Sequence, residues 1–204
     1  KNWQVYGAII IGNSCLIILL YGLQSWVPTM LLRVYEWDLI QSGRVYGLIA
    51  MLAGSAGVLS GPIVLRLMSN NEIRAPHFKL AIFGISMASL SLIMLPFQPN
   101  VNIALIFVTL ASFFVTLPLA GTSSAMVIVS PNRIRGVITG IYVVVTSVFG
   151  LVLGPFLVAS STDFIFQDPT AIAKSLALVS VLIGPIGIFF MLKGINYFGE
   201  MKNV

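Results

Sequence analysis

The chain is organised by long apolar stretches that carry no formal charge. Five such stretches cover residues 2–32, 45–65, 80–132, 136–162 and 175–192. A helix needs about 20 apolar residues to cross a bilayer, so each stretch is long enough for a spanning helix. The third stretch is too long for one helix, and Pro96, Pro99 and Asn100 form a turn-like cluster within it. The pattern therefore predicts six membrane helices, over residues 5–32, 43–67, 79–96, 102–129, 132–159 and 171–192.

The composition supports a membrane protein. Hydrophobic residues make up 58% of the chain, charged residues only 8%, and the mean hydropathy is +1.01. A soluble domain carries about a quarter of its residues charged. Because uninterrupted apolar runs do not suit a membrane β-barrel, the fold class is an all-α polytopic membrane protein.

The distribution of basic residues predicts the orientation. Most of them fall on one side of the predicted bundle, whereas the other side has only Arg33, Arg44 and Lys174. By the positive-inside rule, both termini are expected in the cytoplasm, in a multi-pass protein of the plasma (inner) membrane. The basic residues are dispersed among loops, so no nucleic-acid partner is expected. The chain has one cysteine, Cys15, and one histidine, His77, and neither a metal site nor a cofactor is expected.

An internal repeat links the two halves of the chain. One constant offset aligns five glycine or proline pairs: Gly43 with Gly136, Gly47 with Gly140, Gly57 with Gly150, Gly61 with Gly154, and Pro62 with Pro155. All lie on the second helix of a three-helix set. Three is odd, so the second set is inverted across the membrane. We therefore expect two inverted repeats, residues 1–100 and 101–204, an organisation typical of transporters.

Several motifs resemble the major facilitator superfamily, specifically its carboxy-terminal half of six helices. The similarity covers the whole chain and looks most like the spinster-like branch, with the organic-anion symporter branch second. The motifs are Tyr21-Gly22-Leu23-Gln24-Ser25-Trp26-Val27-Pro28, Gly57-x-x-x-Gly61-Pro62 followed by Arg66, Pro131-Asn132-Arg133-Ile134-Arg135-Gly136, and Gly150-x-x-x-Gly154-Pro155 followed by Asp163.

The resemblance implies a secondary transporter, such as a symporter, of which this chain is one half. Its partners would be a small-molecule substrate, the lipid bilayer and an amino-terminal half of six helices. Arg66, Arg133 and Arg135 would then lie in cytoplasmic loops. Leu65 departs from the family's loop motif, which places an acid before the basic residue. The chain does not begin with Met, and we expect it to be a fragment.

Polar residues inside the spans are the candidate substrate contacts. On a helix with 100° per residue, the polar side chains of the first, fourth and fifth spans gather on arcs of about 60–80°. A membrane helix turns such a stripe toward another helix or toward an aqueous cavity. The residues expected to line a substrate cavity are Asn13, Tyr21, Gln24, Thr116, Tyr142 and Thr146.

Glycines and prolines form a second kind of face on the second and fifth spans. Small residues at helical spacing allow close approach of a neighbouring helix. This face either packs statically within the bundle or slides against the missing half during transport. The candidate gating or helix-packing residues are Gly57, Gly61, Pro62, Gly150, Gly154 and Pro155.

The residue types within the spans separate the functional hypotheses. No Asp, Glu, Lys, Arg or His lies inside the charge-free stretches, so the middle of each predicted span offers no group for ion coupling. An intramembrane serine protease needs a histidine facing its serine, so an enzyme is not expected. We expect a secondary transporter that moves a small organic or amphipathic solute by alternating access. A six-helix scaffold or channel-like subunit is the alternative.

Overall fold

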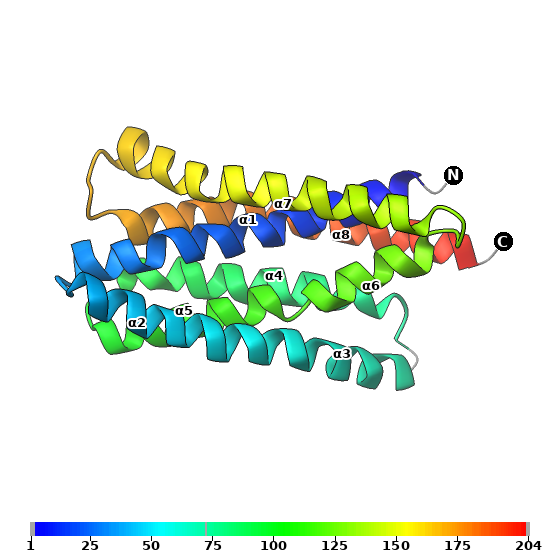
Figure 1. Cartoon of the computed structure of the whole chain (residues 1–204), viewed down its shortest axis with the longest axis horizontal. Coiled ribbons are helices and arrows are strands. Elements are labelled where there is room, and N and C mark those ends of the chain that lie inside the picture. Colours follow the sequence, from blue (N-terminus) through cyan, green and yellow to red (C-terminus); the bar gives the residue numbers. More distant parts are fainter. Residues whose placement is uncertain (1–2, 72, 203–204) are drawn as a thin grey trace.

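The computed structural model describes residues 3–71 and 73–202 of the 204-residue chain. Across these residues, six helices are long and apolar enough to cross a membrane, as the uncharged stretches predict. They run side by side along the long axis of the molecule (Figure 1). The described residues form helices and turns without a strand, which confirms the all-α membrane fold.

The spans differ in how continuous they are. The first and sixth are single helices, α1 (Trp3–Val34) and α8 (Ile172–Lys202). The third is α4 (Pro76–Met94), extended by the 3₁₀ turn η2 (Leu95–Phe97). The second consists of α2 (Leu39–Ile49), the π-helix η1 (Ala50–Gly54) and α3 (Ser55–Asn70). The fourth consists of α5 (Val101–Thr116) and α6 (Leu119–Val129), and the fifth of α7 (Arg135–Ser160) and the π-helix η3 (Ser161–Phe166).

The fourth span is interrupted by a proline near its middle. Pro118 has no backbone N–H and its ring crowds the preceding turn, so α5 ends at Thr116 and α6 begins at Leu119. The chain still turns helically across the break, because the Thr122 amide donates to the Pro118 carbonyl at 2.9 Å. The span predicted over residues 102–129 is therefore confirmed, with an interruption of the helix at this proline.

Proline and asparagine set the ends of two spans. Pro76 opens α4 in the first turn, where its missing N–H costs no hydrogen bond. The Asn100 side chain caps α5 by accepting a 2.9 Å hydrogen bond from the Asn102 amide. This cap confirms the turn predicted between the third and fourth spans.

The first span lies at the centre of the bundle. In its most apolar window 61% of the residues are buried, against 22% in the second span and 28% in the fifth. α1 packs mainly against α7 and α8, and α4 packs mainly against α8 and α5. The second and fifth spans therefore lie on the flanks, where Figure 1 shows α2 and α3 on one side and α7 on the other. Side chains that are fully buried between the spans include Leu16, Leu23, Val27, Ile85, Ala88, Val108 and Met191.

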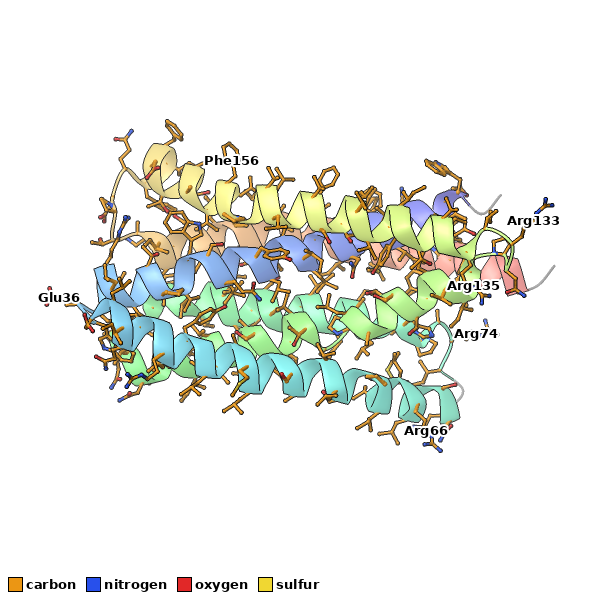
Figure 2. All side chains as sticks on the ribbon, viewed as in Figure 1. Glu36, Arg66, Arg74, Arg133, Arg135 and Phe156 are labelled. Atoms are coloured by element: carbon orange, nitrogen blue, oxygen red, sulfur yellow. The ribbon has the colours of Figure 1, made fainter. Side chains whose placement is uncertain are left out.

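Basic side chains gather at one end of the bundle. Figure 2 shows Arg66, Arg74, Arg133 and Arg135 at the end where α1 begins and α8 ends, and Glu36 at the opposite end. This grouping is the one on which the predicted orientation depends. Lys1, which belongs to the same predicted group, lies outside the described residues.

Candidate functional site

An open groove of about 490 Å³ lies between the first, second and fourth spans. It is close to the middle of all three, because Leu20, Gly54 and Thr116 stand near the centres of their spans. The groove is lined by Leu20 and Gln24 of α1, by Ala50, Gly54, Ser55, Val58 and Leu59 of η1 and α3, and by Thr116 and Leu119 beside the break in the fourth span.

Small residues bring the second span against the fourth at this groove. A β-carbon on Gly54 would meet the Thr116 methyl group at 4.0 Å, and one on Gly57 would overlap the Thr116 hydroxyl oxygen. The π-helix η1, a conformation that occurs often at functional sites, contributes Ala50 and Gly54 to the lining. The groove is therefore bordered by irregular backbone on the second span and by a broken helix on the fourth.

The polar side chains of the groove differ in how they are satisfied. The Thr116 hydroxyl is buried and lies 2.9 Å from the Ser112 carbonyl and 3.0 Å from the Phe113 carbonyl of its own helix. Gln24 is exposed, and its amide forms no hydrogen bond within the described residues. Gln24 is thus a long polar side chain of this lining whose amide has no partner among the described residues.

A second group of polar side chains lies between α1, α6 and α7. The Thr122 hydroxyl donates a 2.7 Å hydrogen bond to the Asn13 side-chain oxygen, and both residues are buried. The hydroxyls of Ser123 and Tyr142 are 3.4 Å apart. Asn13 and Tyr142 therefore contribute to a network that ties three helices together.

The six residues predicted to line a cavity fall into separate places. Gln24 and Thr116 share the groove, whereas Asn13 and Tyr142 belong to the buried network. The Thr146 hydroxyl donates to the Tyr142 carbonyl of its own helix at 2.8 Å. Tyr21 is half-buried and lies against Gly150 and Gly154 of α7.

Apolar and small residues of the groove were not singled out by the sequence. In an apolar span only polar positions stand out as a stripe. Nothing in the sequence therefore distinguishes the apolar lining residues from lipid-facing ones: Leu20, Val58, Leu59 and Leu119. Thr122 was also not among the residues expected to line a cavity, although it is a polar residue inside the fourth span.

The glycines of the two small-residue faces divide into two sets. Gly57 and Gly61 of α3 lie against Phe113, Thr116 and Leu117 in the fourth span. Gly150 and Gly154 of α7 lie against Ile17, Ile18 and Tyr21 of α1, and a β-carbon on Gly154 would be 2.7 Å from the Ile18 carbonyl oxygen. These four glycines make close contacts inside the bundle.

The remaining glycines of these faces are open. A β-carbon on Gly43, Gly47, Gly136 or Gly140 would meet no atom of the described chain within 4 Å. These positions lie in the first third of the second and fifth spans, which are the two least buried spans. Close packing within the bundle and an open face thus occupy different parts of the same two spans.

The two candidate prolines occupy different surroundings. Pro155 of α7 accepts a 3.0 Å hydrogen bond from the Trp26 indole nitrogen through its carbonyl, which ties α7 to α1. Pro62 of α3 is exposed. The paired prolines of the predicted repeats therefore differ in their contacts.

The loop arginines are arranged at one end of the bundle. Arg66 and Arg133 are exposed, and Arg135 is half-buried at the first residue of α7. The Arg135 guanidinium donates 2.6 Å and 3.4 Å hydrogen bonds to the Asn132 side chain and the Ser130 carbonyl. Arg135 therefore holds the connection between α6 and α7, while Arg66 and Arg133 remain free to contact other groups.

His77, the one histidine of the chain, ties two helices together. It is in the first turn of α4, half-buried, and its Nδ1 lies 3.0 Å from the Gly121 carbonyl oxygen, to which it donates a hydrogen bond. This bond ties the start of α4 to α6, just beyond the proline break.

Comparison with known proteins agrees with this architecture. The family model described as Major Facilitator Superfamily matches residues 1–155. No curated protein matches the chain. Among solved structures, the chain is similar to a bacterial homologue of the human lysosomal transporter Spinster in an inward-facing and occupied conformation, with 14% identity and a TM-score of 0.68 over 98% of this chain.

The same kind of bacterial Spinster homologue in an inward-facing and unoccupied conformation matches 95% of the chain, again with 14% identity and a TM-score of 0.68. The chain spans about half of these transporters, 49% of the first and 46% of the second. At this identity the likeness shows the fold, and the family model covers most of the sequence. The chain belongs to the major facilitator superfamily, a family of membrane transporters.

Proposed function

We propose that this chain is the carboxy-terminal half, with six helices, of a secondary transporter that moves a small organic or amphipathic solute by alternating access. The groove beside Gln24 and Thr116 carries the proposal. Its volume of about 490 Å³ falls within the range of about 300–1,000 Å³ typical of small-molecule sites. Its position near the middle of three spans is where a transported solute has to be held between the two sides of a membrane.

An amino-terminal half is the partner that this arrangement favours. The second and fifth spans are the least buried, and they expose large apolar side chains such as Leu59 and Val144. The groove opens between elements that a second bundle could cover. Contacts between the two predicted inverted repeats, 1–100 and 101–204, support this organisation. In each repeat the second helix packs on the first helix of the other repeat: α3 packs on the fourth span, and α7 packs on α1.

The sequence and the fold also support finer features of the proposal. The motif resemblance favours the spinster-like branch. The basic end of the bundle favours cytoplasmic termini in a plasma (inner) membrane. If the transporter is a symporter, the coupling group belongs to the other half, since the spans of this half carry no acidic or basic side chain apart from those at their ends.

Cysteine accessibility in the full-length transporter tests the groove. Gln24→Cys and Ser55→Cys, each in a Cys15→Ser background, should react in native membranes with a small water-soluble thiol reagent, because both residues are exposed in the groove lining. A solute path must admit water when it is open to one side, whereas lipid excludes a charged reagent. Labelling should fall when the transporter is trapped with the groove closed.

Leu90→Cys and Leu182→Cys are the matched controls. Both leucines are about half exposed, but they lie on α4 and α8, away from the groove. They should stay protected from the reagent. Equal protection of the two groove variants and the two controls would contradict a substrate path at this groove and favour a scaffold.

A further inference from the structure

The lining of the groove carries no formal charge. The side chains that border it are leucine, valine, alanine, glycine, serine, threonine and glutamine. Near the middle of a membrane an ion without a countercharge is costly, because few water molecules remain to solvate it. This wall of the groove therefore offers no partner to a charged group of a solute.

Hydrogen-bonding capacity in the groove is concentrated at Gln24. The Thr116 hydroxyl already donates to backbone carbonyls of α5, so its proton is occupied. A glutamine amide offers two N–H donors and one carbonyl acceptor. The Gln24 amide makes no hydrogen bond to any other described part of the chain, and Ser55 lines the same groove from the second span.

Apolar side chains form most of the remaining surface. Leu20 stands beside Gln24 on α1, Val58 and Leu59 line the groove from α3, and Leu119 closes the side near the helix break. Such walls suit a hydrocarbon body, because binding removes apolar surface from water on both partners. The groove thus combines the Gln24 amide and the Ser55 hydroxyl with a largely apolar surface.

We propose that this groove binds an amphipathic solute through an uncharged hydrogen-bonding group of that solute. Gln24 recognises this group, and the leucine and valine side chains of the groove contact the apolar part of the solute. The proposal rests on the transport function proposed above and names the class of its substrate. A hydroxyl, ester or amide of the solute would pair with the donors or the acceptor of the Gln24 side chain. A carboxylate or an ammonium group would lack a countercharge here.

A reporter cysteine in the groove tests this specificity. Val58→Cys in the Cys15→Ser background of the full-length transporter places a thiol in the lining without altering Gln24. The labelling rate of this thiol is measured with three probes of equal chain length: the glycerol monoester of octanoic acid, octanoate and octylammonium. We expect the uncharged ester to protect the thiol at concentrations at which the two ions do not.

Two glutamine variants then assign the recognition to one residue. Gln24→Leu should weaken protection by the ester about threefold to tenfold, the loss of one hydrogen bond. Gln41→Leu is the matched control, because Gln41 is exposed on α2 outside the groove and should leave protection unchanged.

The outcomes separate this proposal from the proposed transport function. If the Val58→Cys thiol is labelled but the three probes protect it equally, or Gln24→Leu has no effect, the substrate class is overturned and the groove as a solute path stands. If that thiol is never labelled, the groove is not a solute path and both proposals fail.

Discussion

Gly57 of α3 lies so close to Thr116 of α5 that a β-carbon on the glycine would overlap the threonine hydroxyl oxygen. The two spans can approach this closely only because Gly57 has no side chain. The same relationship recurs at the other side of the bundle, where Gly150 of α7 meets Ile17 and Tyr21 of α1. Close packing inside the bundle therefore accounts for these two glycines.

Leucine at these positions should destabilise the bundle. Gly57→Leu and Gly150→Leu each force a large side chain into space already filled by the neighbouring helix, and such overpacking costs about 1–3 kcal/mol or more. We expect lower thermal stability and less folded protein in detergent for both variants. The measurement is the unfolding temperature of the purified transporter by intrinsic fluorescence.

Gly47→Leu and Gly140→Leu are the matched controls, because no atom of the described chain lies within 4 Å of their β-carbon positions. They should leave the unfolding temperature of this half unchanged. If they also abolish uptake, the open ends of the two faces are where the amino-terminal half approaches. Normal stability of Gly57→Leu would contradict static packing at the inner glycines.

The Asn13 and Thr122 pair should contribute a measurable coupling energy. The 2.7 Å hydrogen bond joins α1 to α6 in a buried position. Side-chain hydrogen bonds between membrane helices contribute about 0.6 kcal/mol on average and up to about 1.7 kcal/mol. We expect a coupling in this range from Asn13→Leu, Thr122→Val and the double variant, measured by reversible unfolding in mixed micelles.

This double-mutant cycle, which compares Asn13→Leu, Thr122→Val and the double variant, can also contradict the prediction. If the two single changes add without coupling, the hydrogen bond contributes nothing beyond the contacts of each residue alone. Tyr6, whose hydroxyl donates to the Val129 carbonyl at 3.2 Å, offers a comparison on the same helix pair. Tyr6→Phe combined with Asn13→Leu should be additive, since the two residues share no partner.

We expect acid to weaken the hydrogen bonds of Asp168 in the connection before α8. Its carboxylate accepts hydrogen bonds from the Thr170 amide at 2.8 Å and from the Thr170 hydroxyl at 2.7 Å, which lower the pKa of Asp168 below its ordinary value of 3.8. A depressed pKa means that the stabilising contribution is complete above the ordinary value and is lost as the pH falls through the lowered pKa.

Hydrogen exchange of the Thr170 amide measures this loss. The protection factor, corrected for the intrinsic rate at each pH, should be constant above about pH 4 and fall in more acidic solution. Asp168→Asn should remove the pH dependence. A protection factor that falls equally in both proteins would assign the effect to other groups.

The number of spans and most of their ends were predictable because they depend on local chemistry. A long charge-free apolar stretch indicates a membrane span. Asn100 marks the start of α5, because its side chain accepts a capping hydrogen bond from the Asn102 amide. The break at Pro118 and the π-helix at Ala50–Gly54 were not predictable in the same way. In a membrane a proline is compatible with a kink as well as a break, and a π-turn depends on the helix packed beside it.

The sequence predicts which face of a helix the polar site residues share, but not at which level along the helix they contact other groups. The polar stripe of α1 places Asn13 and Gln24 on one face of the helix, yet they are separated by about 16 Å along the helix at 1.5 Å per residue. They therefore lie at different levels, one in a buried network and one in an open groove. The apolar lining of that groove has no signature that distinguishes it from a lipid-facing surface.

The orientation of the chain is the last prediction. The arginines Arg66, Arg74, Arg133 and Arg135 lie at the end of the bundle where α1 begins and α8 ends (Figure 2). Basic residues are retained on the cytoplasmic side during insertion, so a reporter protein fused after Lys202 of the full-length transporter should be active in the cytoplasm.

A cysteine at Asn100, which is exposed in the connection at the opposite end, should react with an impermeant thiol reagent added outside intact cells. A second cysteine at Asn71, exposed at the basic end, should react only after the cells are permeabilised. Labelling of Asn71→Cys in intact cells would reverse the assignment, and it would place the buried Asn13 and Thr122 network, rather than the connection at Asn100, toward the outside.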